Sequence, residues 1–253
     1  MALAILEGAM VALPRPEALT HITRLRSPAW SILLPGAILL GTFGVLALPP
    51  MASALVLLGL IATPLLAFVA ALTVVRGNRG RLLLAVVVGT IFAAMSNGWV
   101  GELAGNMLTA LGCLALGAAL VRLIPRRWLP LGVLSMCIVD VMLLALGVGE
   151  SAGGLLANAA AHFHAPVLTR ADAGPISVDY PDLVLAAVLG CTVAGSRMQR
   201  GAAWLVTVLA GAYGLLLPAA GALPATVPIA LAFVLVRWGP LPQRRRALAP
   251  QMP

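Results

Sequence analysis

The sequence contains few charged residues and no lysine at all. Only 9% of its 253 residues are charged, whereas 61% are hydrophobic. A soluble domain of this size would carry about a quarter charged residues. The apolar residues gather in repeated runs of roughly 16 to 25 residues, and about 20 apolar residues cross a bilayer as a helix. The composition therefore excludes an ordinary soluble domain and predicts an all-α polytopic membrane protein.

Cysteine and histidine are also scarce. Cys113, Cys137 and Cys191 all fall inside apolar runs without the spacing of metal ligands, so they are expected to be small buried side chains and not disulfides. His162 and His164 form the short segment "HFH", which lacks a partnered carboxylate. We therefore expect neither a metal nor another cofactor.

The basic residues mark membrane topology. All sixteen are arginines, and they lie in short clusters between the apolar runs, which is a topology signal and not a nucleic-acid footprint. With eight spans, every cluster falls on one side of the membrane, and only Arg170 falls on the other. Both termini are thus expected in the cytoplasm. Abundant alanine and glycine without lysine are typical of a GC-rich bacterial genome, so we expect a bacterial plasma membrane.

The apolar runs predict four regions. Residues 1–28 form a cytoplasmic N-terminal segment, and residues 29–128 form four transmembrane helices. Residues 129–238 form a four-helix core with an outer loop at 150–176, and residues 239–253 form a basic cytoplasmic tail. The predicted spans are 30–48, 51–75, 82–98, 103–124, 129–149, 177–196, 202–219 and 222–238.

Acidic residues number only eight, and most have ordinary positions. Five are expected to be solvated: Glu7, Glu17, Glu102, Glu150 and Asp172. Asp140 differs, because it lies in the middle of "LPLGVLSMCIVDVMLLALGVG", about 14 Å from the outer end of its span. A carboxylate at that depth costs at least about 2.5 to 3.5 kcal/mol, so by default it indicates function. The alternative is a hydrogen bond to a neighbouring helix.

Asp182 lies near the start of the next span, in "VDYPDLVLAAVLG". It is about 8 Å deep if that helix begins near Ser177. Consecutive antiparallel spans can bring Asp140 and Asp182 together. Two carboxylates in an apolar site share a proton, which provides a general base for water and a general acid for the leaving amine. This pairing predicts peptide hydrolysis within the membrane. Alternatively, Asp182 merely caps its helix.

The segment "GALPATVPIALAF" opens the last span. Pro224 and Pro228 leave backbone groups unpaired, which a membrane protein tolerates where the backbone lines a cavity or is buried in protein. Such groups could hold an extended substrate strand. Alternatively, the prolines only start the helix.

In their order, these three segments resemble the presenilin and signal peptide peptidase family of intramembrane aspartic proteases. That family carries YD in one span, GxGD at the start of the next and PAL near the start of the last, where this chain has "IVDVM", "DYPDLVLAAVLG" and "LPATVP". The resemblance covers roughly residues 129–238, and "DYPD" replaces GxGD.

The resemblance implies a presenilin-like fold, with Asp140 and Asp182 as the catalytic dyad. It places Pro224, Ala225 and Thr226 beside the substrate cleft and makes a transmembrane peptide or signal peptide the substrate, in contact with the lipid bilayer. Asp179 and Tyr180 stand in the GxGD segment, where we expect them to modulate the dyad.

Other functions remain open. "PDLVLAAVLG" is similar to the apolar stretch that follows the GxGD motif of prepilin peptidases. A proton-coupled small-solute transporter could use the two aspartates as a relay, and its polar path would draw on Asn97, Asn106, Thr109 and Ser135. An inactive relative of the same fold, or an assembly protein with both aspartates in interhelical hydrogen bonds, is a further alternative.

Overall fold

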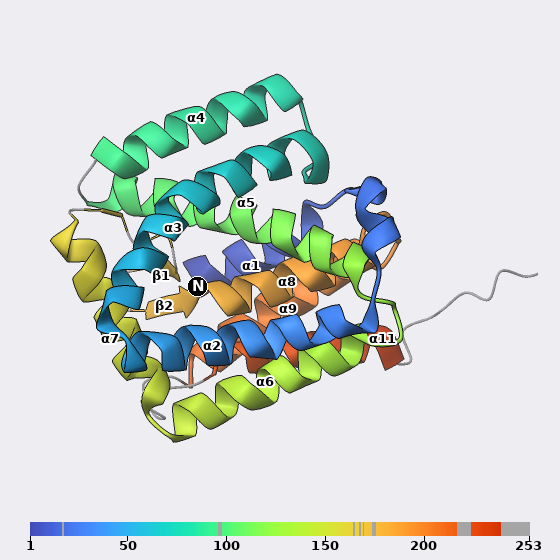
Figure 1. Ribbon diagram of the computed structural model, residues 1–253. Coiled ribbons are helices and arrows are strands. Elements are labelled where there is room, and N and C mark those ends of the chain that lie inside the picture. The colour runs from blue at the N-terminus through green and yellow to red at the C-terminus, as the bar shows by residue number, and fades with distance from the viewer. Residues whose placement is uncertain are drawn as a thin grey trace, which may run out of the picture.

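The computed structural model describes most of the chain as a bundle of helices with one small hairpin (Figure 1). The described residues are 1–16, 18–95, 98–163, 165–166, 168, 170–173, 176–216 and 224–238. Glu17, Asn97, His164 and the tail at 239–253 lie outside them, as does the beginning of the last predicted span.

Eight helices or helix pairs lie at the positions of the eight predicted spans. They are η2 and α2 (Pro28–Ile32, Leu33–Ala47), α3 and η3 (Pro49–Val69, Ala70–Val74), α4 (Arg79–Met95), α5 (Trp99–Leu123), α6 (Leu129–Ala145), α8 (Tyr180–Val193), α9 (Gln199–Gly214) and α11 (Thr226–Trp238). Three are long and apolar enough to cross a membrane, namely Pro28–Ala47, Pro50–Val74 and Trp99–Leu123. The all-α class is confirmed, whereas the count of eight spans stays a prediction.

The first segment of the chain is folded into the bundle. Helix α1 (Ala2–Ala12) packs against α8 and α9, and the short helix η1 (Thr20–Leu25) follows it. Glu7 of α1 exposes only 2% of its surface. The expectation that Glu7 is solvated is therefore wrong, because Glu7 lies on the side of α1 that neighbouring elements cover, whereas Ile5 on another side is exposed.

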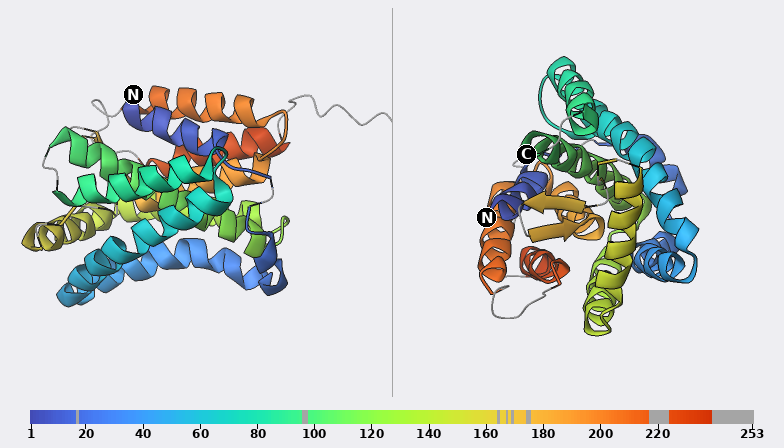
Figure 2. Two further views of the ribbon diagram at one scale, coloured as in Figure 1. Left: turned by 90° about the horizontal axis from the view of Figure 1, so that it is seen from above. Right: turned by 90° about the vertical axis from the view of Figure 1, so that its left-hand side faces the viewer.

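The predicted outer loop at 150–176 also contains regular structure. Helix α7 (Val148–His162) fills its first half and packs against α2 and α3. Strands β1 (Arg170–Ala173) and β2 (Ile176–Asp179) then form an antiparallel hairpin in which Ala171 pairs with Val178. The expectation of a loop without regular structure is wrong here. Figure 2 shows the hairpin at one end of the bundle, surrounded by helices.

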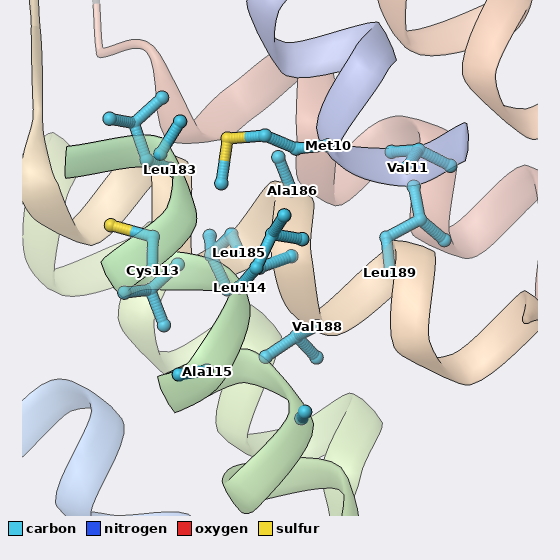
Figure 3. Packing of buried hydrophobic residues seen from close by; sticks show 14 of the residues in the cluster. Met10, Val11, Cys113, Leu114, Ala115, Leu183, Leu185, Ala186, Val188 and Leu189 are labelled. Atoms are coloured by element: carbon cyan, nitrogen blue, oxygen red, sulfur yellow. The ribbon is translucent and has the colours of Figure 1, made fainter. Parts of the chain in front are cut away.

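Helix α8 lies in the middle of the bundle, where α1, α5, α9 and α11 pack around it. An unbroken run from Asp182 to Gly190 is buried. Figure 3 shows Met10 and Val11 of α1, together with Cys113 and Leu114 of α5, beside the buried side chains of α8. A helix that is apolar on all sides belongs in such a position, which explains the seven apolar residues that follow Asp182.

Two glycines bring neighbouring helices close to α8. A Cβ atom on Gly117 of α5 would lie 2.8 Å from the carbonyl carbon of Ala187. A Cβ atom on Gly190 of α8 would lie 2.6 Å from the carbonyl oxygen of Met10. Real side chains do not approach backbone atoms so closely, so α1 and α5 can reach α8 only because these positions lack a side chain.

A buried glutamine fixes the end of α1. The side-chain nitrogen of Gln199 donates hydrogen bonds of 3.1 Å each to the carbonyl oxygens of Val11, Ala12 and Pro14. Its side-chain oxygen accepts a bond of 2.9 Å from Arg76. These bonds satisfy carbonyl groups that the end of a helix leaves without partners, and they hold α1 against α9.

Helix α11 connects the two helices that carry the aspartates. It packs against α6, α8 and α9, whereas α6 and α8 share no extensive direct contact. The expectation that consecutive spans would bring Asp140 and Asp182 together by packing on each other is therefore incomplete. The last helix stands between them.

We expect Gly117→Ala and Gly190→Ala each to lower the free energy of unfolding by about 1 to 3 kcal/mol, because each adds a methyl group to a full contact. Gly41→Ala in α2 is the matched control, since nothing lies within 4 Å of its Cβ position and alanine favours a helix. Reversible unfolding in mixed micelles measures all three. Equal stability of the three variants would contradict the close packing around α8.

Candidate functional site

Asp182 lies in the first turn of α8, at the point where the hairpin passes into that helix. Strand β2 ends at Asp179, Tyr180 begins α8, and Pro181 stands in its first turn. Proline suits this position because its missing N–H has no helical partner there. The strand and the helix thus share one rigid connection, and Asp182 follows it directly.

The Asp182 carboxylate is buried. The residue exposes 6% of its surface, and its Oδ1 atom has no hydrogen-bond partner among the described residues. The backbone of Asp179 lies within hydrogen-bonding reach of the carboxylate. Asp179 is the N-cap of α8, and Asp182 stands three residues later, where a side chain can reach back to the N-cap backbone. Asp182 is therefore not the cap itself, and one of its oxygens stays without a partner.

Asp140 is half-buried on α6 and is held by the last helix. The Thr226 hydroxyl donates a hydrogen bond of 2.7 Å to Asp140 Oδ2. Thr226 is fully buried and begins α11. A predicted cleft residue therefore contacts a predicted catalytic residue directly. The same bond joins α6 and α11, so the alternative that Asp140 bonds a neighbouring helix is also observed.

The aspartates belong to one electrostatic cluster. Of the charged groups that act on Asp182, Asp140 has the largest effect, followed by Asp179 and then Glu7. Asp140 is also the charged group with the largest effect on Asp179. Like charges in an apolar region cannot all be ionised at once. Asp140 thus lies within electrostatic reach of Asp182, and so does Glu7, which sequence reasoning missed.

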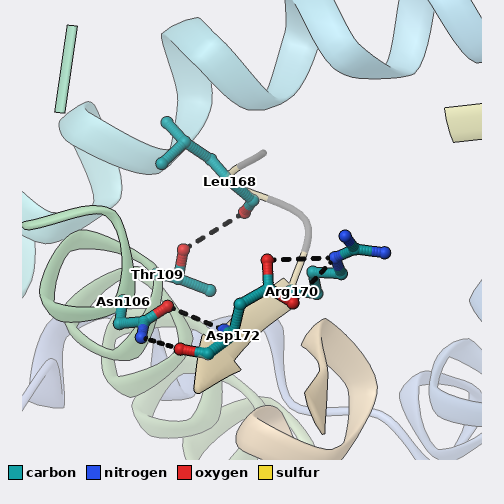
Figure 4. Close-up of polar contacts among 5 residues, drawn as sticks. All are labelled: Asn106, Thr109, Leu168, Arg170 and Asp172. Carbon is teal, nitrogen blue, oxygen red and sulfur yellow. Dashed lines mark hydrogen bonds and ion pairs between the residues drawn. The ribbon is translucent and has the colours of Figure 1, made fainter. Parts of the chain in front are cut away.

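The hairpin is attached to α5 by two polar side chains (Figure 4). The Asn106 amide donates to the carbonyl oxygen of Asp172 at 2.6 Å and accepts from its N–H at 2.9 Å. The Thr109 hydroxyl donates to the carbonyl oxygen of Leu168 at 3.3 Å. The Arg170 guanidinium forms an ion pair of 2.9 Å with the Asp172 carboxylate. These residues position the segment that leads to Asp182.

The pairing of the hairpin shows which edge is open. The N–H and C=O groups of one residue in an antiparallel strand point to the same side. Asp172 points both groups toward Asn106, so its partner Ser177 points both of its groups away from β1. Asn106 covers the edge of β1, while the edge of β2 at Ser177 has no backbone partner among the described residues.

Tyr180 lies against α5 and an apolar cavity. Its ring lines an apolar cavity of about 440 Å³ between α2, α3 and α5, together with Pro181 and Thr63. A Cβ atom on Gly112 of α5 would lie 3.3 Å from its hydroxyl oxygen. Tyr180 therefore packs beside the site, whereas Asp179 lies within electrostatic reach of Asp140 and of Asp182.

The other candidates contribute less. Pro224 and Ala225 precede α11 and are half-buried, and the Pro224 carbonyl oxygen accepts a hydrogen bond from the Val227 N–H at 3.2 Å. His162 is exposed in the last turn of α7. No group of three or more potential metal ligands occurs among the described residues.

Comparisons with known proteins do not extend these observations. No protein-family model, no curated protein and no solved structure matches this chain. What the chain does must accordingly be inferred from its residues and their geometry.

We expect the bond between Thr226 and Asp140 to contribute about 0.6 kcal/mol to stability, and at most about 1.7 kcal/mol, as interhelical hydrogen bonds in membranes do. A double-mutant cycle with Thr226→Val and Asp140→Ala measures this coupling through unfolding in mixed micelles. Thr226→Ser keeps the hydroxyl and should keep most of the coupling. A coupling energy of zero would show that the two side chains do not interact.

Proposed function

We propose that this protein is an intramembrane aspartic endopeptidase that hydrolyses transmembrane segments or signal peptides through Asp140 and Asp182. The observation that carries the proposal is the hydrogen bond from Thr226 to Asp140, together with a buried Asp182 that has one oxygen without a partner among the described residues. A buried acid with a free oxygen and a second acid held in a fixed position are the groups that an aspartic protease needs.

The two acids have different surroundings, which suggests different roles. The Thr226 hydroxyl stabilises negative charge on Asp140, so Asp140 accepts a proton from water as that water attacks the scissile carbonyl carbon. Asp182 donates its proton to the carbonyl oxygen, which gives a tetrahedral diol. Asp140 then protonates the amide nitrogen, Asp182 recovers its proton from the diol, and the C–N bond breaks. A carboxylic acid and an amine leave, and no metal or covalent intermediate takes part.

The open edge of β2 supports a peptide as substrate. An extended chain can bind an exposed strand edge through backbone hydrogen bonds, and Ser177 presents both of its backbone groups there. The hairpin continues directly into the first turn of α8. A peptide strand paired along β2 would therefore lead toward Asp182. A helix must unwind before its backbone can be cut, and this edge would stabilise the unwound form.

The proposed setting is the bacterial plasma membrane, with eight spans in a presenilin-like fold and both ends of the chain in the cytoplasm. The three long apolar helices support the membrane location. In this orientation the hairpin and the first turn of α8 lie toward the outer side, because only Arg170 falls on that side of the predicted topology.

A proton-coupled small-solute transporter is the second candidate, and Glu7 favours it by adding a second buried acid to the cluster. The polar side chains that would line its path have other partners, however. Asn106 and Thr109 hold the hairpin segment, and Ser135 donates to the Gly132 carbonyl oxygen. An inactive protein of the same fold is the remaining alternative.

We expect purified protein in liposomes to cut synthetic single-span peptides, including a signal peptide, within their apolar segment. Asp140→Asn and Asp182→Asn should each lower the rate by at least about 10²-fold, because general acid–base catalysis contributes that much. Glu102→Gln is the control, since it removes an exposed carboxylate from α5. Mass spectrometry of the products measures cleavage, and thermal unfolding checks that each variant is folded.

Three outcomes would overturn the proposal. The first is cleavage that survives both aspartate substitutions. The second is the absence of cleavage together with solute uptake that depends on a proton gradient, which would establish the transporter. The third is neither cleavage nor uptake, with no binding of transition-state analogues of aspartic proteases, which would establish an inactive protein.

A further inference from the structure

Glu7 is a buried acid that the proposed cleavage steps do not use. It exposes 2% of its surface, and its Oε2 atom has no hydrogen-bond partner among the described residues. Helix α1 has eleven residues and is too short to span a membrane. A buried carboxylate without a partner is costly when ionised, so its presence in an otherwise apolar helix calls for a function.

Glu7 lies on the side of α1 that faces α8. Residues three and four positions apart share one face of a helix, which places Glu7 on the same face as Met10 and Val11. Those two residues meet Gly190 of α8, and Figure 3 shows Met10 beside Leu183. Glu7 is also among the three carboxylates whose charges act on Asp182.

The unpartnered atoms of the described chain favour a link between these two acids. Only three buried side-chain atoms there lack a hydrogen-bond partner: Glu7 Oε2, Asp182 Oδ1 and Arg15 Nη2. Two of the three are carboxylate oxygens on the packed helices α1 and α8. Arg15 lies beyond the end of α1, where its Nε donates to the Val75 carbonyl oxygen, and no ion pair joins it to Glu7 among the described residues.

Among the described residues, no counter-ion faces Glu7 from the elements that pack most closely against α1, which are α5, α8, α9 and β1. On α8 the charged neighbour is Asp182 itself. Arg200 of α9 is exposed, and Arg122 of α5 donates to the carbonyl oxygens of Pro16 and Ala18. Arg170 of β1 is paired with Asp172. Burial accordingly raises the pKa of Glu7 to about 8, which keeps its proton available at neutral pH.

We propose that Glu7 and Asp182 form a buried proton-exchanging pair between α1 and α8. A proton leaves Glu7 Oε2 for Asp182 Oδ1 when Asp182 has lost its own, and it returns when Asp182 is reprotonated, so the pair holds one proton over a wide range of pH. A role in catalysis rests on the proposed function, in which Glu7 keeps Asp182 in the acid form with which each cleavage begins. The existence of the pair does not depend on that function.

The test is an infrared titration of the full protein in liposomes, which requires no catalysis. Wild-type protein should show the C=O band of a protonated carboxylic acid that Glu7→Gln removes. In the wild-type protein the coupled acids titrate as a pair, so the last carboxylic acid band is lost at a raised pH. In Asp182→Asn this coupling is absent, and the Glu7 band should be lost at a pH about one unit lower than that last wild-type step. Glu102→Gln, which changes an exposed acid of α5 to an amide, is the control and should leave the midpoint unchanged.

Two results would overturn the pair. One is the absence of any protonated-acid band that depends on Glu7, and the other is a Glu7 band whose midpoint does not move in Asp182→Asn.

If Glu7→Gln does not fold, modification of wild-type Glu7 by a hydrophobic carbodiimide, located by mass spectrometry across the same pH range, identifies its protonated form. If the bands are coupled but the protein cleaves no peptide, the protease proposal is refuted and the Glu7–Asp182 pair is supported. If the protein cleaves peptides but Glu7 is uncoupled from Asp182, the protease proposal is supported and the pair is refuted.

Discussion

The burial of Asp182 in the central helix, with no counter-ion in the described part of the chain, is the constraint on which this structure depends. Helix α8 is enclosed by four other helices, and the charged groups that act on Asp182 are all acids. Such a residue destabilises the fold when it is ionised, so its presence indicates that it holds a proton and serves a function. The glycines that bring α1 and α5 against α8 exclude water from its flanks, so the packing that makes the site costly also lowers its effective dielectric constant.

The last helix completes the site. Because α6 and α8 do not pack together extensively, Asp140 depends on α11 for its position, through the hydroxyl of Thr226. The hairpin positions the other aspartate, because β2 runs directly into the first turn of α8. Two aspartates from separate helices are thus oriented by different elements, and the free edge of β2 leads into the helix that carries Asp182. This arrangement suits an extended peptide that approaches an acid pair from one side.

Hydropathy and charge predicted the helices well, since a long apolar run has few alternatives to a helix. Asp140 and Asp182 stood out because carboxylates are costly within such runs. The sequence did not reveal the burial of Glu7, because an apolar segment of eleven residues is too short to register as a span and looks like a leader. The hairpin was missed for a different reason: its strands have four residues each, and the pairing of Asn106 with Asp172 joins positions far apart in the chain.

The central claim is that Asp140 and Asp182 face one site. Cross-linking tests it most directly, in a protein whose native cysteines are replaced by alanine and which carries Asp140→Cys and Asp182→Cys. A short bifunctional thiol reagent should join the two positions within one chain, seen as a linked peptide pair by mass spectrometry. The pair Glu102→Cys and Asp182→Cys serves as the comparison and should not be joined. Failure of the first pair to cross-link, while both thiols react with a monofunctional reagent, would contradict the shared site.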